Sequence, residues 1–144
     1  MCVDPLFALA TLAALVAVSA LIGIAVRAAQ GRVRADGQHV DRALTADGAE
    51  LTLLQLSSPV CSACAAMRRV GGQLASDDAT VGHREIDVTE HPELVRELGI
   101  MSTPTTLVVD RAGRVRSRII GAATVDTVRQ TLQDARTIRE EVAA

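Results

Sequence analysis

The hydrophobic pattern of the chain changes abruptly after its first residues. Leu6 to Val26 form one uncharged and mainly apolar run, whereas the remainder mixes polar residues with short apolar segments. A helix of that length, rising about 1.5 Å per residue, spans the roughly 30 Å hydrocarbon core of a bilayer. A cleaved signal peptide would place basic residues before a shorter apolar region, and no basic residue precedes this run. We therefore expect residues 1–26 to be a tail and one transmembrane helix that contacts the lipid bilayer.

The next segment, residues 27–50, is polar and contains three glycines and scattered charges. This composition is typical of an exposed linker. A short first strand is expected around Val40 to Leu44, where apolar residues return. The folded domain should then cover residues 51–144.

From Leu51 onward, apolar residues show the spacings of strands and helices in turn. Short apolar runs bounded by turn residues predict strands, and apolar residues three or four positions apart predict helices. In chain order we expect a strand at Leu51–Leu56, a helix at Cys61–Ser76, a strand at His83–Val88, a short helix between Pro92 and Gly99, strands at Thr105–Val109 and Arg114–Ile120, and a helix from Val125 to Ala135 capped by Thr124. Apolar strands need cover on both faces, so this order predicts an α/β fold with helices on both sides of a sheet.

Composition narrows the classes of function. The 144 residues suit one compact domain, and 15 basic against 17 acidic residues give a net charge of −2. Basic residues are spread along the chain, which excludes a basic nucleic-acid-binding surface. All of them are arginine, a bias that fits a GC-rich genome. Arg114, Arg116 and Arg118 alternate along the last predicted strand, where we expect a solvated face that protects a sheet edge.

Two of the three cysteines have a spacing with chemical meaning. Cys61 and Cys64 form a CxxC pair where a predicted strand leads into a predicted helix. Cys2 precedes the apolar run, whereas a lipoprotein cysteine would follow one, and we assign it no role. Three cysteines are too few for the disulfide framework of a small secreted domain. A zinc site would need a second Cys or His pair at a suitable spacing, so we predict no metal.

The position of the CxxC pair predicts a reactive dithiol. Cys61 should lie at a helix N-terminus, where free N–H groups and the helix dipole favour a thiolate. Cys64 follows one turn later with its Cβ about 5 to 6 Å away, within reach of a disulfide. Cys61 is therefore the candidate nucleophile toward a partner disulfide, and Cys64 is the candidate resolving thiol. Two unreactive core cysteines are the alternative. Neither interpretation requires a cofactor.

The residues around and after the CxxC pair resemble the thioredoxin family. The likeness runs from about Leu51 to Ala135, and Glu85–Val109 resembles that family's strand, short helix and proline loop. Thr103 and Pro104 stand in the place of its cis-proline motif. The resemblance implies a thioredoxin-like fold with a central mixed sheet and a cis bond before Pro104. It also implies that Thr103 and Pro104 bind a partner's extended chain beside the dithiol.

Several positions depart from the family pattern. Val60 replaces the tryptophan before the first cysteine, and by its position it should contact substrate. Ser62 and Ala63 replace the Gly-Pro between the cysteines and should tune the reduction potential. Gln55 replaces the family's buried acid and cannot take up a proton. His83 replaces a lysine, and we expect it to be exposed at a strand end.

We expect a membrane-tethered thiol-disulfide oxidoreductase that exchanges disulfides with protein partners. One alternative is an extracytoplasmic thioredoxin-like protein for cytochrome maturation or disulfide formation, and another is a non-catalytic adaptor that binds peptides through the proline loop. Arg27, Arg32 and Arg34 follow the apolar run, and basic residues near a membrane segment tend to stay cytoplasmic. We therefore expect the dithiol domain in the cytoplasm, where thiols are kept reduced.

Overall fold

The structure is a computed structural model that describes residues 5–29 and 31–143. It divides into two units, Met1–Gln30 and Gly31–Ala144, which we describe separately. Cys2 lies outside the described residues. The functional chemistry predicted from the sequence falls in the second unit.

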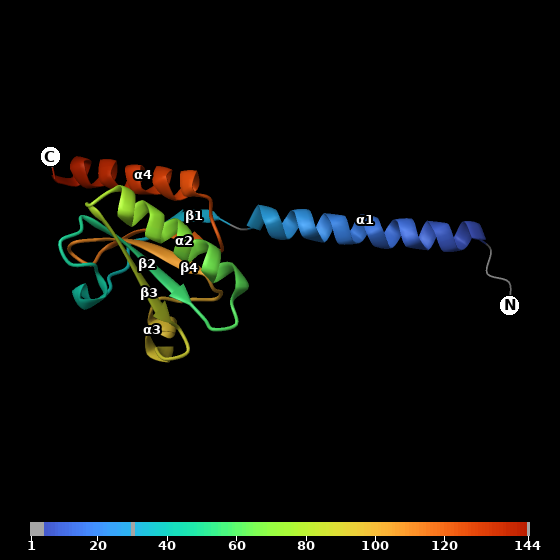
Figure 1. The fold of residues 1–144 in the computed structure, drawn as a ribbon, viewed down its shortest axis with the longest axis horizontal. Coiled ribbons are helices and arrows are strands. Elements are labelled where there is room, and N and C mark those ends of the chain that lie inside the picture. The colour runs from blue at the N-terminus through green and yellow to red at the C-terminus, as the bar shows by residue number, and fades with distance from the viewer. Residues whose placement is uncertain (1–4, 30, 144) are drawn as a thin grey trace. The chain divides into compact units, whose positions relative to one another are not determined.

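The first unit is one helix, α1, over Pro5–Ala29 (Figure 1). Among the side chains described in this helix, residues 9–25, the large apolar ones are exposed: Leu9, Leu12, Leu15, Val16, Val18, Leu21, Ile22 and Ile24. Across the part of the chain that the structure describes, no helix is both long and apolar enough to cross a membrane. The helix predicted over Leu6–Val26 is thus present, but the transmembrane span is not found.

The second unit is built on one five-stranded sheet. Its elements are β1 (Arg32–Ala35), a short 3₁₀ helix η1 (Arg42–Leu44), β2 (Leu51–Ser57), α2 (Ser62–Asp77), β3 (Val81–Asp87), α3 (Pro92–Glu97), β4 (Thr105–Asp110), β5 (Val115–Ile120) and α4 (Val125–Ala143). The strands lie in the order β1-β5-β4-β2-β3. The β2–β3 pair is parallel and all the other pairs are antiparallel, so the mixed α/β sheet is confirmed.

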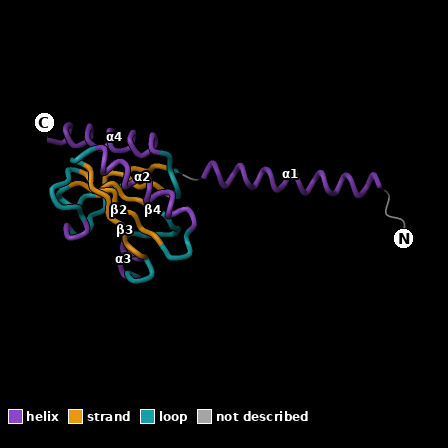
Figure 2. The backbone as a smooth tube through the Cα atoms, viewed as in Figure 1, coloured by secondary structure: helices purple, strands orange, loops and turns teal. Residues whose placement is uncertain are grey.

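The helices cover both faces of this sheet, as the alternation in β2 requires. Leu51 and Leu53 pack in the cluster beneath α2 and α4, together with Met67 and Leu132. The intervening side chains point the other way, so Leu54 belongs to the cluster that α3 covers. Figures 1 and 2 show α2 and α4 on one side of the strands and α3 on the other. The sheet therefore carries α2, and the cysteines at its start, on one defined face.

The first strand differs from the predicted one. Instead of a strand at Val40–Leu44, the chain forms β1 at Arg32–Ala35, which pairs with β5. The Asp41 side chain accepts a hydrogen bond from the Ala43 N–H at 2.9 Å and caps a single 3₁₀ turn there. This local hydrogen bond competes with extended pairing, whereas β1 gains partners only from a strand distant in sequence.

The environment of Arg114, Arg116 and Arg118 also differs from the prediction. Because β1 pairs with β5, the last strand is not a sheet edge. The side chains of Arg116 and Arg118 are only 11% and 14% exposed, and they form ion pairs with Asp110 at 2.8 Å and Asp36 at 2.9 Å. Arg114 is exposed. Two of the three arginines thus fix the hairpin and the start of the domain instead of forming a solvated face.

Candidate active site at the start of helix α2

A tight turn connects β2 to α2 and places the dithiol at the start of the helix. Ser57 ends β2, and the Cys61 N–H donates to the Ser58 carbonyl at 3.1 Å across a turn with Pro59 at its second position. Proline favours that position because its ring fixes the required φ. The helix then starts with Cys61 as its N-cap residue. The predicted place of Cys61 at a helix N-terminus is confirmed.

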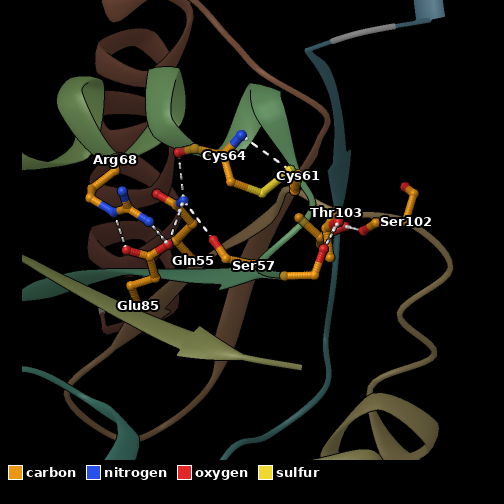
Figure 3. The surroundings of a disulfide bond; sticks show 10 residues. Gln55, Ser57, Cys61, Cys64, Arg68, Glu85, Ser102 and Thr103 are labelled. Carbon is orange, nitrogen blue, oxygen red and sulfur yellow. Dashed lines mark hydrogen bonds and ion pairs between the residues drawn. A yellow bond between two sulfur atoms is a disulfide. The ribbon is translucent and has the colours of Figure 1, made fainter. Parts of the chain in front are cut away.

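Cys61 and Cys64 are joined by a disulfide, with their Cα atoms 5.4 Å apart (Figure 3). The Cys64 N–H donates to Cys61 Sγ at 3.1 Å. Cys61 is half-buried, whereas Cys64 is only 2% exposed. A partner can therefore reach the first sulfur, while the second is covered by the domain. Val60, directly before the pair, is 94% exposed.

The proline loop lies against this turn. The Thr103–Pro104 peptide bond is cis, as the resemblance implied, and Pro104 is buried. The hydroxyls of Ser58 and Thr103 are 3.2 Å apart and share a hydrogen bond between the two segments. The Gly121 N–H donates to the Pro104 carbonyl at 2.8 Å, which holds the loop from its other side. Two segments distant in sequence thus form one surface around Cys61 (Figure 3).

Two exposed apolar side chains, Val60 and Met101, stand on the loops that carry the dithiol and the proline. Met101 is 93% exposed and also lines a hollow of about 560 Å³ beside the proline loop. Arg34 and Arg118 line the same hollow. Val60 therefore offers an apolar contact next to the dithiol, and Met101 offers one on the proline loop, where basic side chains line the adjoining hollow.

Gln55 is fully buried behind the disulfide and joins several polar groups. Its Nε2 donates to Ser57 Oγ at 2.8 Å and to the Cys64 carbonyl at 3.0 Å, and it lies 3.4 Å from Glu85 Oε1. Its Oε1 lies 3.1 Å from His83 Nε2, so the imidazole donates from that nitrogen. The amide thus replaces a titrating acid with fixed hydrogen bonds. His83 is half-buried in this network and not exposed as expected.

Charged groups frame the outer side of this network. Arg68 of α2 forms two hydrogen bonds with the Glu85 carboxylate, one of them from Nη2 at 2.7 Å. These bonds are the main cause that holds the pKa of Glu85 below its usual value, against the opposing effect of burial. Burial lowers the pKa of His83, and Arg68 adds to this effect while Glu85 opposes it. The network therefore favours an ionised Glu85 and a neutral His83.

The structure brings Cys61, Cys64, Val60 and the proline loop together, and it adds Arg68 and Glu85, which the sequence did not connect with them. The contact between Arg68 and Glu85 depends on the parallel pairing of β2 with β3, which sets Glu85 opposite Gln55. No local sequence pattern specifies that register. Ser62 is exposed and Ala63 half-buried in the first turn of α2. Within residues 5–29 and 31–143, no group of three or more His, Cys, Asp or Glu side chains is placed to hold a metal ion.

Comparison with known proteins agrees with this geometry. A family model described as a thioredoxin-like domain matches residues 38–136. Among curated proteins, no sequence matches the chain. The structure is similar to oxidized mitochondrial thioredoxin 3 from Saccharomyces cerevisiae, with 21% identity over 60% of this chain and 80% of that one, and a TM-score of 0.53.

It is also similar to thioredoxin from Trypanosoma brucei brucei, with 22% identity over 66% of this chain and 80% of that one, and a TM-score of 0.54. Oxidised thioredoxin from Plasmodium falciparum gives 20% identity over 60% of this chain and 81% of that one, with a TM-score of 0.51. At such identities these likenesses support the fold.

Proposed function

This chain belongs to the thioredoxin-like domain family, and from that membership we propose that it is a thiol-disulfide oxidoreductase acting on protein partners. One observation carries the proposal: the Cys61–Cys64 disulfide lies at the N-terminus of α2, beside a cis-proline loop. A helix N-terminus stabilises a thiolate, and a second cysteine one turn away can release a mixed disulfide. The pair requires no metal or organic cofactor for this exchange.

The different burial of the two cysteines supports different roles for them. Cys61 is the more accessible, and its Sγ already accepts the Cys64 N–H. As a thiolate, Cys61 attacks one sulfur of a partner disulfide, and the partner's other sulfur leaves as a thiolate that takes up a proton. Cys64 then loses its proton and attacks Cys61 Sγ, which forms the intramolecular disulfide and releases the partner's second thiol. The reverse sequence oxidises a partner.

We propose that partners bind as extended segments across the proline loop. The exposed side chains of Val60 and Met101 supply apolar contacts, and Thr103 bonds the turn that leads to the dithiol through Ser58. Ser62 and Ala63 occupy the first turn of the helix, where a change of residue alters the electrostatic environment of the thiolate and so the reduction potential.

Insulin reduction in the presence of dithiothreitol tests the activity. We expect the wild-type chain and Cys2→Ser to reduce insulin, and Cys61→Ser and Cys64→Ser to fail. In addition, Cys64→Ser should accumulate mixed disulfides with partner proteins on non-reducing gels, because the resolving step is missing, whereas Cys61→Ser should capture none. Equal capture by both variants would contradict the assigned roles.

The same experiment separates this function from a peptide-binding adaptor. An adaptor would hold its partner equally well after replacement of both cysteines and would not accelerate insulin reduction. The accessible Cys61 beside the loop favours the enzyme. An extracytoplasmic protein for cytochrome maturation or disulfide formation would share the chemistry and differ in location.

For location, we propose that the dithiol domain is attached to the cytoplasmic side of the cell membrane through α1. The exposed apolar side chains of that helix support contact with lipid, and the arginines after it support a cytoplasmic position. A membrane-impermeant maleimide added to intact cells should spare Cys61 after mild reduction, and labelling of Cys61 would place the domain outside.

A further inference from the structure

Thr106 carries a buried hydroxyl that has no hydrogen-bond partner. The residue is 1% exposed, and among the described residues only its Oγ1 and Arg136 Nε are buried side-chain atoms of this kind. The Arg136 guanidinium donates a hydrogen bond to Asp78 through Nη2, so this charged group has a partner. In Thr106 the hydroxyl is the whole polar function, and buried hydroxyls are almost always paired.

The register of the sheet places Thr106 beneath the turn of α2 that contains Cys64. Thr106 lies opposite Gln55 in the β2–β4 pair, and side chains opposite one another share a face of the sheet. Leu53, two residues before Gln55, lies opposite Val108, two residues after Thr106. Both pack in one cluster with Met67 of α2.

Cys64 lies one helical turn before Met67, toward the end of the sheet that carries Gln55 and Thr106. Gln55 confirms this arrangement, because its Nε2 donates to the Cys64 carbonyl at 3.0 Å. The register therefore places the unpaired hydroxyl on the face of the sheet that α2 covers, at the level of the helical turn that contains Cys64.

Gln55 and Glu85, which lie in the same row of the sheet as Thr106, have no free donor for the Cys64 sulfur. The Gln55 amide already donates to Ser57 and to the Cys64 carbonyl, and its oxygen is held by His83. Glu85 is a carboxylate bound by Arg68 and offers acceptors only. A buried thiolate without a donor is costly, whereas a disulfide sulfur is a weak acceptor.

We propose that Thr106 is a positioning residue that donates its hydroxyl hydrogen bond to the Cys64 sulfur when the disulfide opens, and so stabilises the reduced dithiol. The inference deepens the proposed oxidoreductase function and rests on it for its biological meaning. In the oxidised state the hydroxyl is unpaired, and in the reduced state it gains a sulfur partner. Thr106 thereby shifts the dithiol–disulfide equilibrium without taking part in the exchange of bonds.

The first test measures the equilibrium of the full chain with glutathione. Two glutathione thiols supply two electrons and two protons, so that the Cys61–Cys64 bond breaks, the cysteines become thiols that ionise according to their pKa, and oxidised glutathione forms. At a pH high enough to ionise Cys64, Thr106→Val should lower the equilibrium constant for reduction about tenfold, a potential about 30 mV more negative. Thr106→Ser should retain the wild-type value, because it keeps the hydroxyl. Thr131→Val, a matched change at a buried threonine of α4, should leave the potential unchanged.

The second test does not depend on disulfide exchange. In a Cys61→Ser background, Cys64 is a free thiol whose ionisation can be followed by thiolate absorbance against pH. Adding Thr106→Val should raise the Cys64 pKa by about one unit, a tenfold lower ionisation constant, and adding Thr106→Ser should not. Equal pKa values in all three proteins, or a potential shift that Thr131→Val reproduces, would overturn the proposal. Failure to reduce insulin with these shifts present would instead count against the proposed function.

Discussion

The position of Cys61 at the helix N-terminus and its accessibility both favour a reactive thiol. The residue caps α2, its Sγ accepts the Cys64 N–H at 3.1 Å, and it is the more exposed of the two cysteines in the disulfide. In the reduced protein this N–H and the other free N–H groups at the helix N-terminus stabilise a Cys61 thiolate. Reactivity should therefore differ between two cysteines that are only one turn apart.

We predict that Cys61 in the Cys64→Ser variant titrates below the free-thiol value of about 8.5. The helix N-terminus favours the charged form and so lowers the thiol pKa. The rate of iodoacetamide labelling as a function of pH measures this value. The matched control is Cys64 in the Cys61→Ser variant, which is covered by the domain and should react more slowly. Faster labelling of Cys64 would reverse the assigned roles.

His83 links the same site to pH. Burial lowers its pKa below the ordinary value of 6.5, aided by Arg68 and opposed by Glu85. The folded protein thus binds a proton at His83 less readily than the unfolded chain does. As the pH falls below about 6.5, the unfolded state binds more protons and the free energy of unfolding decreases.

We predict that His83→Gln removes this part of the pH dependence below about pH 6.5. Glutamine keeps a donor for Gln55 Oε1 but does not titrate. Urea unfolding at several pH values measures the effect, and His91→Gln at an exposed position is the control. A wild-type slope that survives in His83→Gln would assign the dependence to other groups.

At the scale of elements, two adjacent glycines of α2 have opposite environments. A Cβ at Gly71 would overlap the His83 ring, whereas a Cβ at Gly72 would meet nothing within 4 Å. Gly71 therefore allows the helix to approach β3 closely enough for His83 to reach Gln55. Gly72 has no such contact, although it costs the helix conformational entropy.

We predict that Gly72→Ala raises the free energy of unfolding by roughly 0.5 to 1 kcal/mol, because alanine restricts the unfolded chain. Gly71→Ala should instead lower it by about 1 to 3 kcal/mol through overpacking against His83. Denaturant unfolding of both variants provides the comparison, and each serves as the control for the other. A stabilising Gly71→Ala would mean that the helix–strand approach is not fixed by this glycine.

At the scale of the whole molecule, the chain contains two units with different surfaces. Both apolar clusters of the sheet are made of residues from the second unit, with none from α1. Among the side chains described in the first unit, the large apolar ones are exposed. Folding of the dithiol domain should therefore not depend on α1, whereas attachment to lipid should depend on it.

We predict that a fragment of residues 31–144 folds cooperatively and keeps the insulin-reducing activity proposed for the full chain. The fragment should remain in the supernatant after membranes are sedimented, whereas the full chain should sediment with them, because α1 carries the exposed apolar surface. Far-ultraviolet circular dichroism and cell fractionation measure the two properties. An unfolded fragment, or a full chain that stays in the supernatant, would contradict this division.

The sequence by itself determined the order of elements from β2 to α4, the reactive CxxC at a helix start and the proline loop. These features depend on apolar periodicity, turn residues and motif spacing, which are local. Tertiary structure decided the position of β1, the burial of Arg116 and Arg118, and the network that connects Gln55 with His83 and Glu85. These features depend on strand pairing and register between distant segments, whose partners a single sequence does not identify. The unpaired Thr106 hydroxyl is of the second kind, because only the fold removes it from water and sets it opposite Gln55.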